Sequence, residues 1–352
     1  MPGQSDVVDG QSIPGSGARE PLLVDLALQG GGSHGAFTWG VLDRLLEEPW
    51  LEVDGVSGTS AGAMNAAVFA YGMLTGGPLA AKAALESFWR KVSAAAAFSP
   101  FQRTPLDMML GRWSLDYSPN YVAANLMARL VSPYSLGGGG ANPLRDILID
   151  CVDFDRLAES RIRIFITATN VRTGRGRIFR NGEITPDVLL ASACLPTMFK
   201  AVMIDGEGYW DGGYSGNPTI TPLVQECQSH DTLIVQINPV VRDEIPESAA
   251  DIHNRINEVS FNATLLKELK MISLLRQVCD ASDGEGWQWA QMRLHLINSD
   301  MMRDLGASSK LNAEWAFLTM LRDEGRRAAS EFIARHATRI GVESTFDFES
   351  VL

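Results

Sequence analysis

Residues 58 to 62 read Gly58-Thr59-Ser60-Ala61-Gly62, a serine with a glycine two positions before it and two after it. Small residues at these positions let a strand turn sharply into a helix and project the serine hydroxyl outward as a nucleophile. Residues 61 to 71 are rich in Ala and Met, so a helix is expected to follow. The free N–H groups of its first turn would favour negative charge beside Ser60. An ordinary N-cap serine in a glycine turn would give the same spacing.

A serine hydroxyl is a poor nucleophile until a neighbouring base accepts its proton. The chain has five histidines: His34, His230, His253, His295 and His336. In the chain order of an α/β-hydrolase triad the base would be His230 or His295, but neither falls in an obvious catalytic turn. Asp211 is a better candidate, because it follows Tyr209-Trp210 and precedes Gly212-Gly213. Burial beside aromatic rings would raise the pKa of its carboxyl, which suits a base, although an Asp-Gly hairpin turn is the simpler alternative.

A run of glycines, residues 30 to 35, follows an apolar segment at residues 22 to 28 that is expected to form a buried strand. Apolar residues at helical spacing come next, from residue 36 to 47. One interpretation is a dinucleotide fingerprint with Asp54 as the acid that binds the ribose. The other is an oxyanion hole, in which glycines let backbone N–H groups converge on a developing negative charge. The second interpretation is favoured because the next strand continues into the Ser60 turn instead of ending at an acid.

Three segments, in this order along the chain, resemble the signatures of the patatin-like phospholipase family. They are Gly30-Gly31-Gly32-Ser33-His34-Gly35, Gly58-Thr59-Ser60-Ala61-Gly62 and Asp211-Gly212-Gly213. The phrase at residues 191 to 196, Ala-Ser-Ala-Cys-Leu-Pro, resembles the helix that precedes the aspartate in this family. The resemblance covers about residues 22 to 237. It implies an α/β protein, a three-layer α/β/α sandwich related to the α/β-hydrolases, in which a Ser-Asp dyad replaces the triad.

The resemblance also implies roles for individual residues. Ser60 would be the nucleophile, Asp211 the general base, and the backbone amides of Gly30, Gly31 and Gly32 the oxyanion hole. The residues that would support these motifs are His34, Gly35, Gly58, Gly62, Gly212 and Gly213. His34 departs from the family pattern, which usually has Arg or Lys at this place. A side chain that titrates near neutrality replaces one that is always charged, which puts in doubt any electrostatic role of this position.

The composition limits the classes of partner. The net charge of −12 and the isoelectric point of about 4.9 argue against nucleic-acid binding and against general attraction to anionic membranes. The four cysteines are scattered and are expected to be free thiols: Cys151, Cys194, Cys227 and Cys279. We recognise no signal peptide and no membrane-spanning segment, so a cytoplasmic protein is expected, with export without a signal left open. The residues indicate no metal, cofactor or oligomeric state.

One catalytic domain with additions at both ends is expected. Residues 1–20 are predicted to be a disordered tail, residues 21–240 the catalytic domain, and residues 241–352 a helical extension packed on it. An insertion at residues 76–142 is rich in large apolar side chains and has a flexible joint at Gly137-Gly138-Gly139-Gly140. It is either a pair of core helices or an apolar cap that binds acyl chains over the active site.

The expected function is that of a serine lipid acyl hydrolase of the phospholipase A, lysophospholipase or esterase type. Its partner would be a lipid or another fatty-acyl ester, with contact to a membrane or micelle surface through the apolar insertion. Two alternatives stay open at this point. One is a nucleotide-binding or dinucleotide-binding protein that uses the glycine loop at residues 30–35. The other is a hydrolase of non-lipid esters, including storage polyesters, because the same dyad serves any ester and only the pocket differs.

Overall fold

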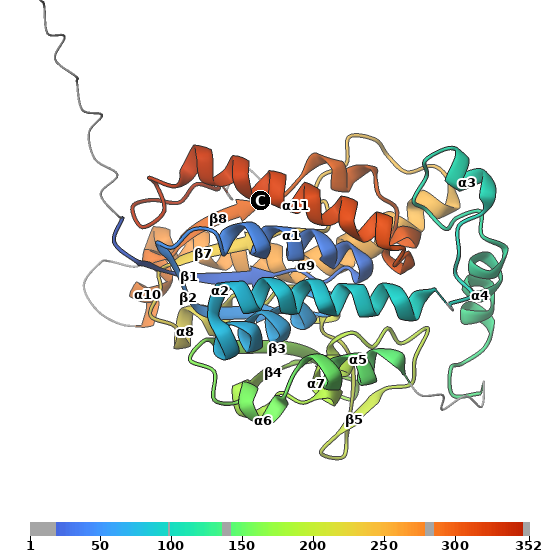
Figure 1. The fold of residues 1–352 in the computed structure, drawn as a ribbon, viewed down its shortest axis with the longest axis horizontal. Helices are drawn as coiled ribbons and strands as arrows, with labels where there is room; N and C mark the ends of the chain where they lie inside the picture. The colour runs from blue at the N-terminus through green and yellow to red at the C-terminus, as the bar shows by residue number, and fades with distance from the viewer. Residues whose placement is uncertain (1–18, 98, 136–141, 279–284, 348–352) are drawn as a thin grey trace, which may run out of the picture.

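The computed structural model describes residues 19–97, 99–135, 142–278 and 285–347 (Figure 1). The predicted tail, except for residues 19 and 20, lies outside these ranges, as do the predicted glycine joint, Phe98 and Cys279. In the part of the chain that is described, no helix combines the length and the apolar character needed to span a membrane.

A sheet of eight strands forms the centre of the molecule, and its strand order is β5-β6-β3-β2-β1-β7-β8 with β4 also paired to β3. The strands are β1 (Leu22–Leu28), β2 (Leu51–Gly58), β3 (Arg163–Asn170), β4 (Gly176–Arg180), β5 (Val202–Ile204), β6 (Glu207–Asp211), β7 (Asp231–Val235) and β8 (Arg293–Ile297). From β3 to β8 along this order the neighbouring strands are parallel, whereas β4, β5 and β6 pair in antiparallel fashion.

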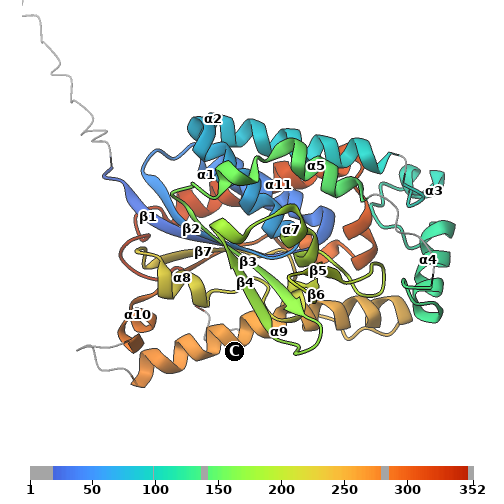
Figure 2. The ribbon, with the colours of Figure 1, turned by 90° about the horizontal axis from the view of Figure 1, so that it is seen from below.

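Helices cover both faces of the sheet, which gives three layers (Figures 1 and 2). On one face lie α1 (Gly35–Leu45), α2 (Ala61–Ala96), α5 (Pro143–Cys151) and α11 (Trp315–His336). On the other face lie α8 (Thr221–Glu226), α9 (Ala249–Val278) and α10 (Glu285–Gln291). The shorter helices are α3 (Pro105–Met109), α4 (Pro119–Leu130), α6 (Phe154–Leu157) and α7 (Pro186–Ser192), and the 3-10 helices used below are η1 (Gly32–His34), η3 (Gly212–Tyr214) and η5 (Ala307–Leu311).

Strands β1 and β3 contribute alternate side chains to two separate hydrophobic cores. In β1, Leu26 and Leu28 belong to the core beneath α1, α2 and α11, whereas Ala27 belongs to the core beneath α8 and α9. In β3, Ile164 and Phe165 are divided between the cores in the same way. This alternation follows from the two-residue period of a strand whose faces are both covered. The predicted three-layer α/β/α sandwich is confirmed.

The chain beyond residue 240 supplies a strand as well as helices. The helices of the predicted extension at residues 241–352 include α9 and α11. The edge strand β8 was not expected, because five residues of alternating character give little periodic signal. Helix α11 crosses α1 at backbone distance: a Cβ on Gly40 would lie 1.9 Å from the carbonyl oxygen of Arg322. The last part of the chain therefore completes both the sheet and its helical cover.

The predicted insertion divides into a buried and an exposed part. Helix α2 is interrupted by non-helical backbone at Gly76 and Gly77, and its second half buries Leu85, Phe88 and Trp89 in the core. The large apolar side chains of α3, α4 and the segment between them are mostly exposed instead. Those with the largest exposed fractions are Leu106, Met109, Leu110, Tyr117, Leu126 and Leu130, at 54 to 84%. Residues 78–96 thus belong to the core, as one of the two interpretations expected, whereas residues 105–130 form an apolar surface.

Candidate active site

Ser60 occupies a strained turn between a strand and a helix. Strand β2 ends at Gly58 and helix α2 begins at Ala61, and the backbone of Ser60 between them has φ 54° and ψ −120°. Residues other than glycine rarely adopt such a positive φ, and strain of this kind is concentrated at functional sites. A Cβ on Gly62 would lie 2.2 Å from the carbonyl oxygen of Leu28 in β1. The glycine after the serine is therefore needed for the close approach of helix α2 to the sheet.

Hydrogen bonds fix the strained turn from two sides. The backbone N–H of Ser60 donates to Ser192 Oγ at 2.9 Å, and the Ser192 hydroxyl donates to the carbonyl oxygen of Thr167 in β3 at 2.7 Å. The neighbouring Thr59 Oγ1 donates to the carbonyl oxygen of Gly216 at 2.7 Å. These contacts join the serine turn to α7, β3 and the loop after Asp211. The turn therefore has long-range support that offsets its backbone strain.

Asp211 lies at the end of β6, opposite Ala168 of β3, and only 2% of its surface is exposed. Its Oδ1 accepts the backbone N–H of Gly213 at 2.7 Å. Burial raises the pKa of the carboxyl to about 7, although the Gly213 amide, the Ser60 hydroxyl and the charge of Lys310 act in the opposite direction. A carboxyl whose pKa lies near neutrality and whose side chain interacts with a serine hydroxyl is suited to accept a proton.

The two glycines after Asp211 let its loop pack tightly. A Cβ on Gly212 would lie 2.0 Å from the carbonyl oxygen of Thr167, and one on Gly213 would lie 2.1 Å from the ring of Phe261 in α9. Both distances are far shorter than real Cβ contacts, so larger residues would push the loop away from β3 or α9. The glycine pair therefore determines how close Asp211 comes to the serine turn.

The glycine loop lies directly against the serine. A Cβ on Gly30 would lie 2.7 Å from Ser60 Cβ. The backbone N–H of Gly30 is already used, because it donates to Asn217 Oδ1 at 2.7 Å. Within the described residues, the N–H groups of Gly31 and Gly32 have no acceptor in the protein. Of the three amides suggested by the sequence, the one at residue 30 is engaged in holding the loop, and those at residues 31 and 32 are free to bind an oxyanion.

A family model described as a patatin-like phospholipase matches residues 26–224, which is more than half of the 352 residues. The chain belongs to the patatin-like phospholipase family. As a member of this family, it is a hydrolase of lipid esters. The match includes the glycine loop, the Ser60 turn and Asp211, so the three segments that were noted in the sequence all fall within it.

Solved structures give weaker similarities, and no curated protein sequence matches the chain. VipD from Legionella pneumophila is similar with 14% sequence identity and a TM-score of 0.40, over 91% of this chain and 68% of VipD. A chain in the ExoU-SpcU complex from the type III secretion system of Pseudomonas aeruginosa is similar with 16% identity and a TM-score of 0.34. That match covers 92% of this chain and 53% of the other, so this chain spans about half of its length.

His34, at the place where the patatin-like phospholipases usually have Arg or Lys, is a neutral packing residue. It is 3% exposed, its Nε2 lies 2.8 Å from Ser309 Oγ, and its ring meets Phe317 edge-on at 6.1 Å. Burial, together with the positive charge of Lys310, holds the pKa of His34 well below its usual range. The doubt about an electrostatic role for this position is justified, because this imidazole is uncharged at neutral pH.

Across the residues that the structure describes, the other histidines of this patatin-like phospholipase form no hydrogen bond with Ser60 or Asp211. His295 lies in β8, where its Nε2 is 2.9 Å from Asp231 Oδ1 and its Nδ1 is 2.9 Å from Thr345 Oγ1. The ring of His230 meets Trp287 edge-on. None of the histidines, all of which lie in the described ranges, hydrogen-bonds Ser60 or Asp211. This arrangement is consistent with a carboxylate base.

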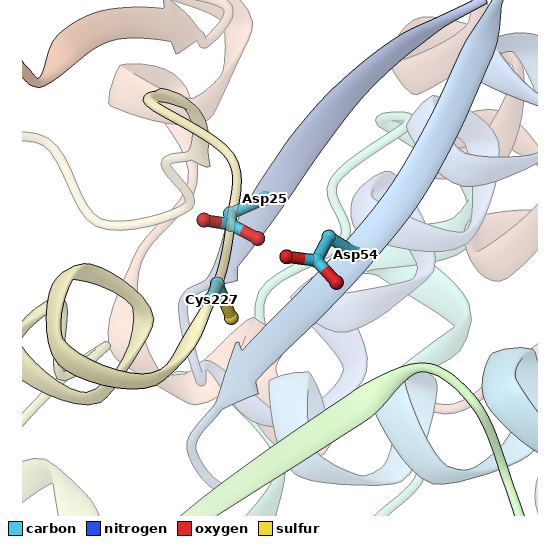
Figure 3. A group of neighbouring side chains, drawn as sticks. All are labelled: Asp25, Asp54 and Cys227. Atoms are coloured by element: carbon cyan, nitrogen blue, oxygen red, sulfur yellow. The ribbon is translucent and has the colours of Figure 1, made fainter.

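Asp54, the candidate acid for a ribose, is occupied by other partners. Its carboxylate pairs with Arg163 at 2.5 Å and accepts the backbone N–H of Gln228. Figure 3 shows it beside Asp25 of β1 and Cys227, and potential ligand atoms of the three lie within 4.8 Å of one another. Burial raises the pKa of Asp25 to about 8 and that of the Cys227 thiol well above its usual range, so both hold their protons at neutral pH. Because Arg163 and the backbone N–H of Gln228 already bind the Asp54 carboxylate, this carboxylate is not free to bind a ribose.

Four residues that support the site were not predicted from the sequence: Ser192, Asn217, Asn238 and Lys310. Asn238 Nδ2 donates to the carbonyl oxygen of Gly30 at 2.9 Å, on the side of the loop opposite to Asn217. Each of the four comes from a different segment, and none belongs to a short motif or to a periodic pattern. Only the position of Ser192, in the phrase that resembles the family helix, carried a signal.

Proposed function

We propose that the protein hydrolyses fatty-acyl esters with a Ser60-Asp211 dyad, and that the N–H groups of Gly31 and Gly32 bind the oxyanion. The observation that carries the proposal is Ser60 itself. A serine held at positive φ between a strand and a helix interacts with a buried carboxylate whose pKa is about 7. Backbone strain and carboxyl groups with a raised pKa are both concentrated at functional sites, and both suit nucleophilic catalysis.

The proposed reaction has two halves. Ser60 Oγ attacks the ester carbonyl carbon while Asp211 accepts the hydroxyl proton, and the negative oxygen receives hydrogen bonds from Gly31 and Gly32. The bond to the alcohol then breaks, and Asp211 returns the proton to the departing oxygen. In the second half a water molecule attacks the acyl-serine and gives its proton to Asp211. The serine oxygen leaves, regains the proton, and the fatty acid is released.

The function is tested by hydrolysis of p-nitrophenyl esters that differ only in acyl length. We expect kcat/KM to rise from the acetyl ester toward medium and long acyl chains, because each methylene buried in an apolar site contributes about 0.8 kcal/mol. The absorbance of the released p-nitrophenolate is followed at fixed pH in the presence of a non-ionic detergent. A rate that is independent of acyl length would favour non-lipid esters, and an inactive wild type would contradict the proposal.

We further propose that the exposed apolar side chains of residues 105–130, here called the α3–α4 apolar surface, contact the lipid aggregate that supplies the substrate. The segment between α3 and α4 leads back to the active site. Trp113 stacks on Phe317 with ring centroids 5.1 Å apart, and Phe317 packs against His34 of the glycine loop. The backbone N–H of Leu115 donates to Ser308 Oγ at 3.0 Å, next to the segment that contacts Gly32. The segment between α3 and α4 therefore packs against residues that contact the glycine loop.

Replacement of four exposed residues of this surface tests the contact: Met109→Ser, Leu110→Ser, Leu126→Ser and Leu130→Ser in one variant. We expect co-sedimentation with phosphatidylcholine vesicles to fall about ten-fold or more, because the apolar area available for insertion is lost. Hydrolysis of a soluble short-chain ester should stay near the wild-type rate. Val342→Ser, which changes another exposed side chain (73%), is the control. Vesicle binding equal to that of the wild type would contradict this role of the surface.

A further inference from the structure

Lys310 lies directly behind the glycine loop, although it comes from the C-terminal part of the chain. Its carbonyl oxygen in η5 would be 2.4 Å from a Cβ on Gly32, so the two backbones are in contact. Its ammonium group donates to Asn238 Oδ1 at 2.8 Å and to Asn257 Oδ1 at 3.0 Å. Two amide oxygens from separate segments thus hold the charge in one place.

The ammonium group is linked to both halves of the active site. Asn238, which accepts from Lys310, donates through Nδ2 to the carbonyl oxygen of Gly30 at 2.9 Å. Lys310 Nζ also lies 5.9 Å from the ring centroid of Phe261, whose ring fills the space beside Gly213. One side of Lys310 therefore supports the glycine loop, and the other faces the loop that carries Asp211.

Four titratable or charged groups face Lys310 from the elements packed around it. They are Asp211 at the end of β6, Glu258 in α9, Arg242 after β7 and His34 in η1. Glu258 already forms ion pairs with Arg242 at 2.5 Å and with Arg255 at 3.2 Å, and His34 is neutral. Among the described residues Asp211 forms no ion pair. The charge of Lys310 therefore acts on two carboxylates, first on Glu258, which is already paired with two arginines, and second on Asp211, which is not.

We propose that Lys310 is a positioning residue of the active site and supplies the positive charge that the glycine loop lacks at position 34. It holds Gly30 in place through Asn238, and its charge favours the carboxylate form of Asp211 over the carboxylic acid. This inference rests on the proposed Ser60-Asp211 chemistry. It adds a residue from outside the matched family region, because that region ends at residue 224.

The titration behaviour of the two groups supports this arrangement. Burial lowers the pKa of Lys310 to about 8, against the opposing charges of Glu258 and Asp211. Lys310 is therefore still mostly protonated at neutral pH, where Asp211 must lose its proton to act as a base. Above the pKa of Lys310 its charge is lost, but by then Asp211 is already ionised. The effect of Lys310 should thus be confined to neutral and acidic pH.

The experiment measures the pH dependence of kcat/KM for a soluble short-chain ester with the wild type, Lys310→Met, Lys310→Arg and Lys267→Met. In Lys310→Met the acidic limb should move to higher pH by about one unit, since a nearby opposite charge lowers a carboxyl pKa by about one to three units. The rate near pH 7 should fall about five-fold from this shift alone, and the ratio of the two rates should become smaller in alkaline solution. Lys310→Arg should keep the midpoint of the wild type, as should the exposed control Lys267→Met.

The outcomes separate this inference from the proposed function. An inactive wild type contradicts the proposed function, whereas an active wild type with an unshifted limb in Lys310→Met overturns the role of Lys310. The same shift in Lys310→Arg as in Lys310→Met would show that packing and not charge is responsible, and would also overturn it. If Lys310→Met does not fold, Lys310→Gln, which is uncharged but keeps an amide donor for Asn238, replaces it in the same measurement.

Discussion

Ester hydrolysis is expected to be lost both in Ser60→Ala and in Ser60→Gly, while the two variants should differ in stability. Removal of the nucleophile should lower kcat/KM by about 10⁴-fold or more. The backbone of Ser60 has φ 54° and ψ −120°, a conformation that costs a residue with a Cβ about 1 to 3 kcal/mol. Ala keeps this strain and Gly relieves it. The Ser60→Gly variant should therefore be more stable than the Ser60→Ala variant, with a free energy of unfolding that is higher by about 1 kcal/mol.

The activity is measured with a p-nitrophenyl ester and the stability by urea unfolding. Ser93, in the regular helical part of α2, is a matched control for the stability comparison. At Ser93 the order of the two substitutions should reverse, since Gly in a helix interior is about 0.5 to 1 kcal/mol less stable than Ala. Substantial hydrolysis by either Ser60 variant would exclude this serine as the nucleophile. Equal stability of the two Ser60 variants would show that the backbone of Ser60 is not strained.

The second large effect is expected in Asp211→Asn, which should lower kcat/KM by about 10³-fold to 10⁴-fold because an amide cannot accept the proton of Ser60. The same change should stabilise the protein in alkaline solution. The carboxyl has a pKa of about 7 in the folded protein and an ordinary value of 3.8. The folded state therefore binds the proton more tightly, and stability is lost as the pH rises from about 4 to about 7.

Asn carries no ionisable group, so the stability difference between Asp211→Asn and the wild type should grow over this pH range. It should be close to zero in acid and reach roughly 4 kcal/mol in alkaline solution. The buried carboxyl of Asp25 is present in both proteins, so its titration cancels in the difference. Thermal unfolding at several pH values measures this, with Asp300→Asn as a control at a largely exposed carboxylate. A constant difference across pH, or an active Asp211→Asn variant, would contradict the assignment of Asp211.

The fold and the candidate residues Ser60 and Asp211 could be read from the sequence because their signals are local. The apolar run of β1, the glycines that follow it and the helical period of α1 lie within 24 consecutive residues. The glycines around Ser60 and after Asp211 mark places where the backbone allows no side chain. Short-range patterns of this kind can be read without knowledge of the tertiary structure. Strand β8 was missed because five alternating residues resemble many exposed segments.

The supporting residues could not be predicted, because their partners are far apart in the sequence. Ser192 is 132 residues from Ser60, and Asn217 is 187 residues from Gly30. Arg163 pairs with the Asp54 carboxylate, which argues against the dinucleotide interpretation, and the two residues are 109 positions apart in the sequence. Composition alone also failed to divide the apolar insertion, since Trp89 in the core and Met109 on the surface are equally apolar. Which of two apolar residues is buried depends on what the rest of the chain packs against it.

The contact between Gly32 and Lys310 has a consequence for the order in which the protein is made. The glycine loop and Ser60 lie at residues 30 to 60, but part of the backbone that supports the loop is that of Lys310, 250 residues after Ser60. Helix α11, which crosses α1 at Gly40, is synthesised later still. During translation the nascent chain thus carries Ser60 before it carries the residues that position the glycine loop. Under the proposed Ser60 chemistry, ester hydrolysis should begin only after Lys310 and α11 have been synthesised and have packed against the glycine loop and α1.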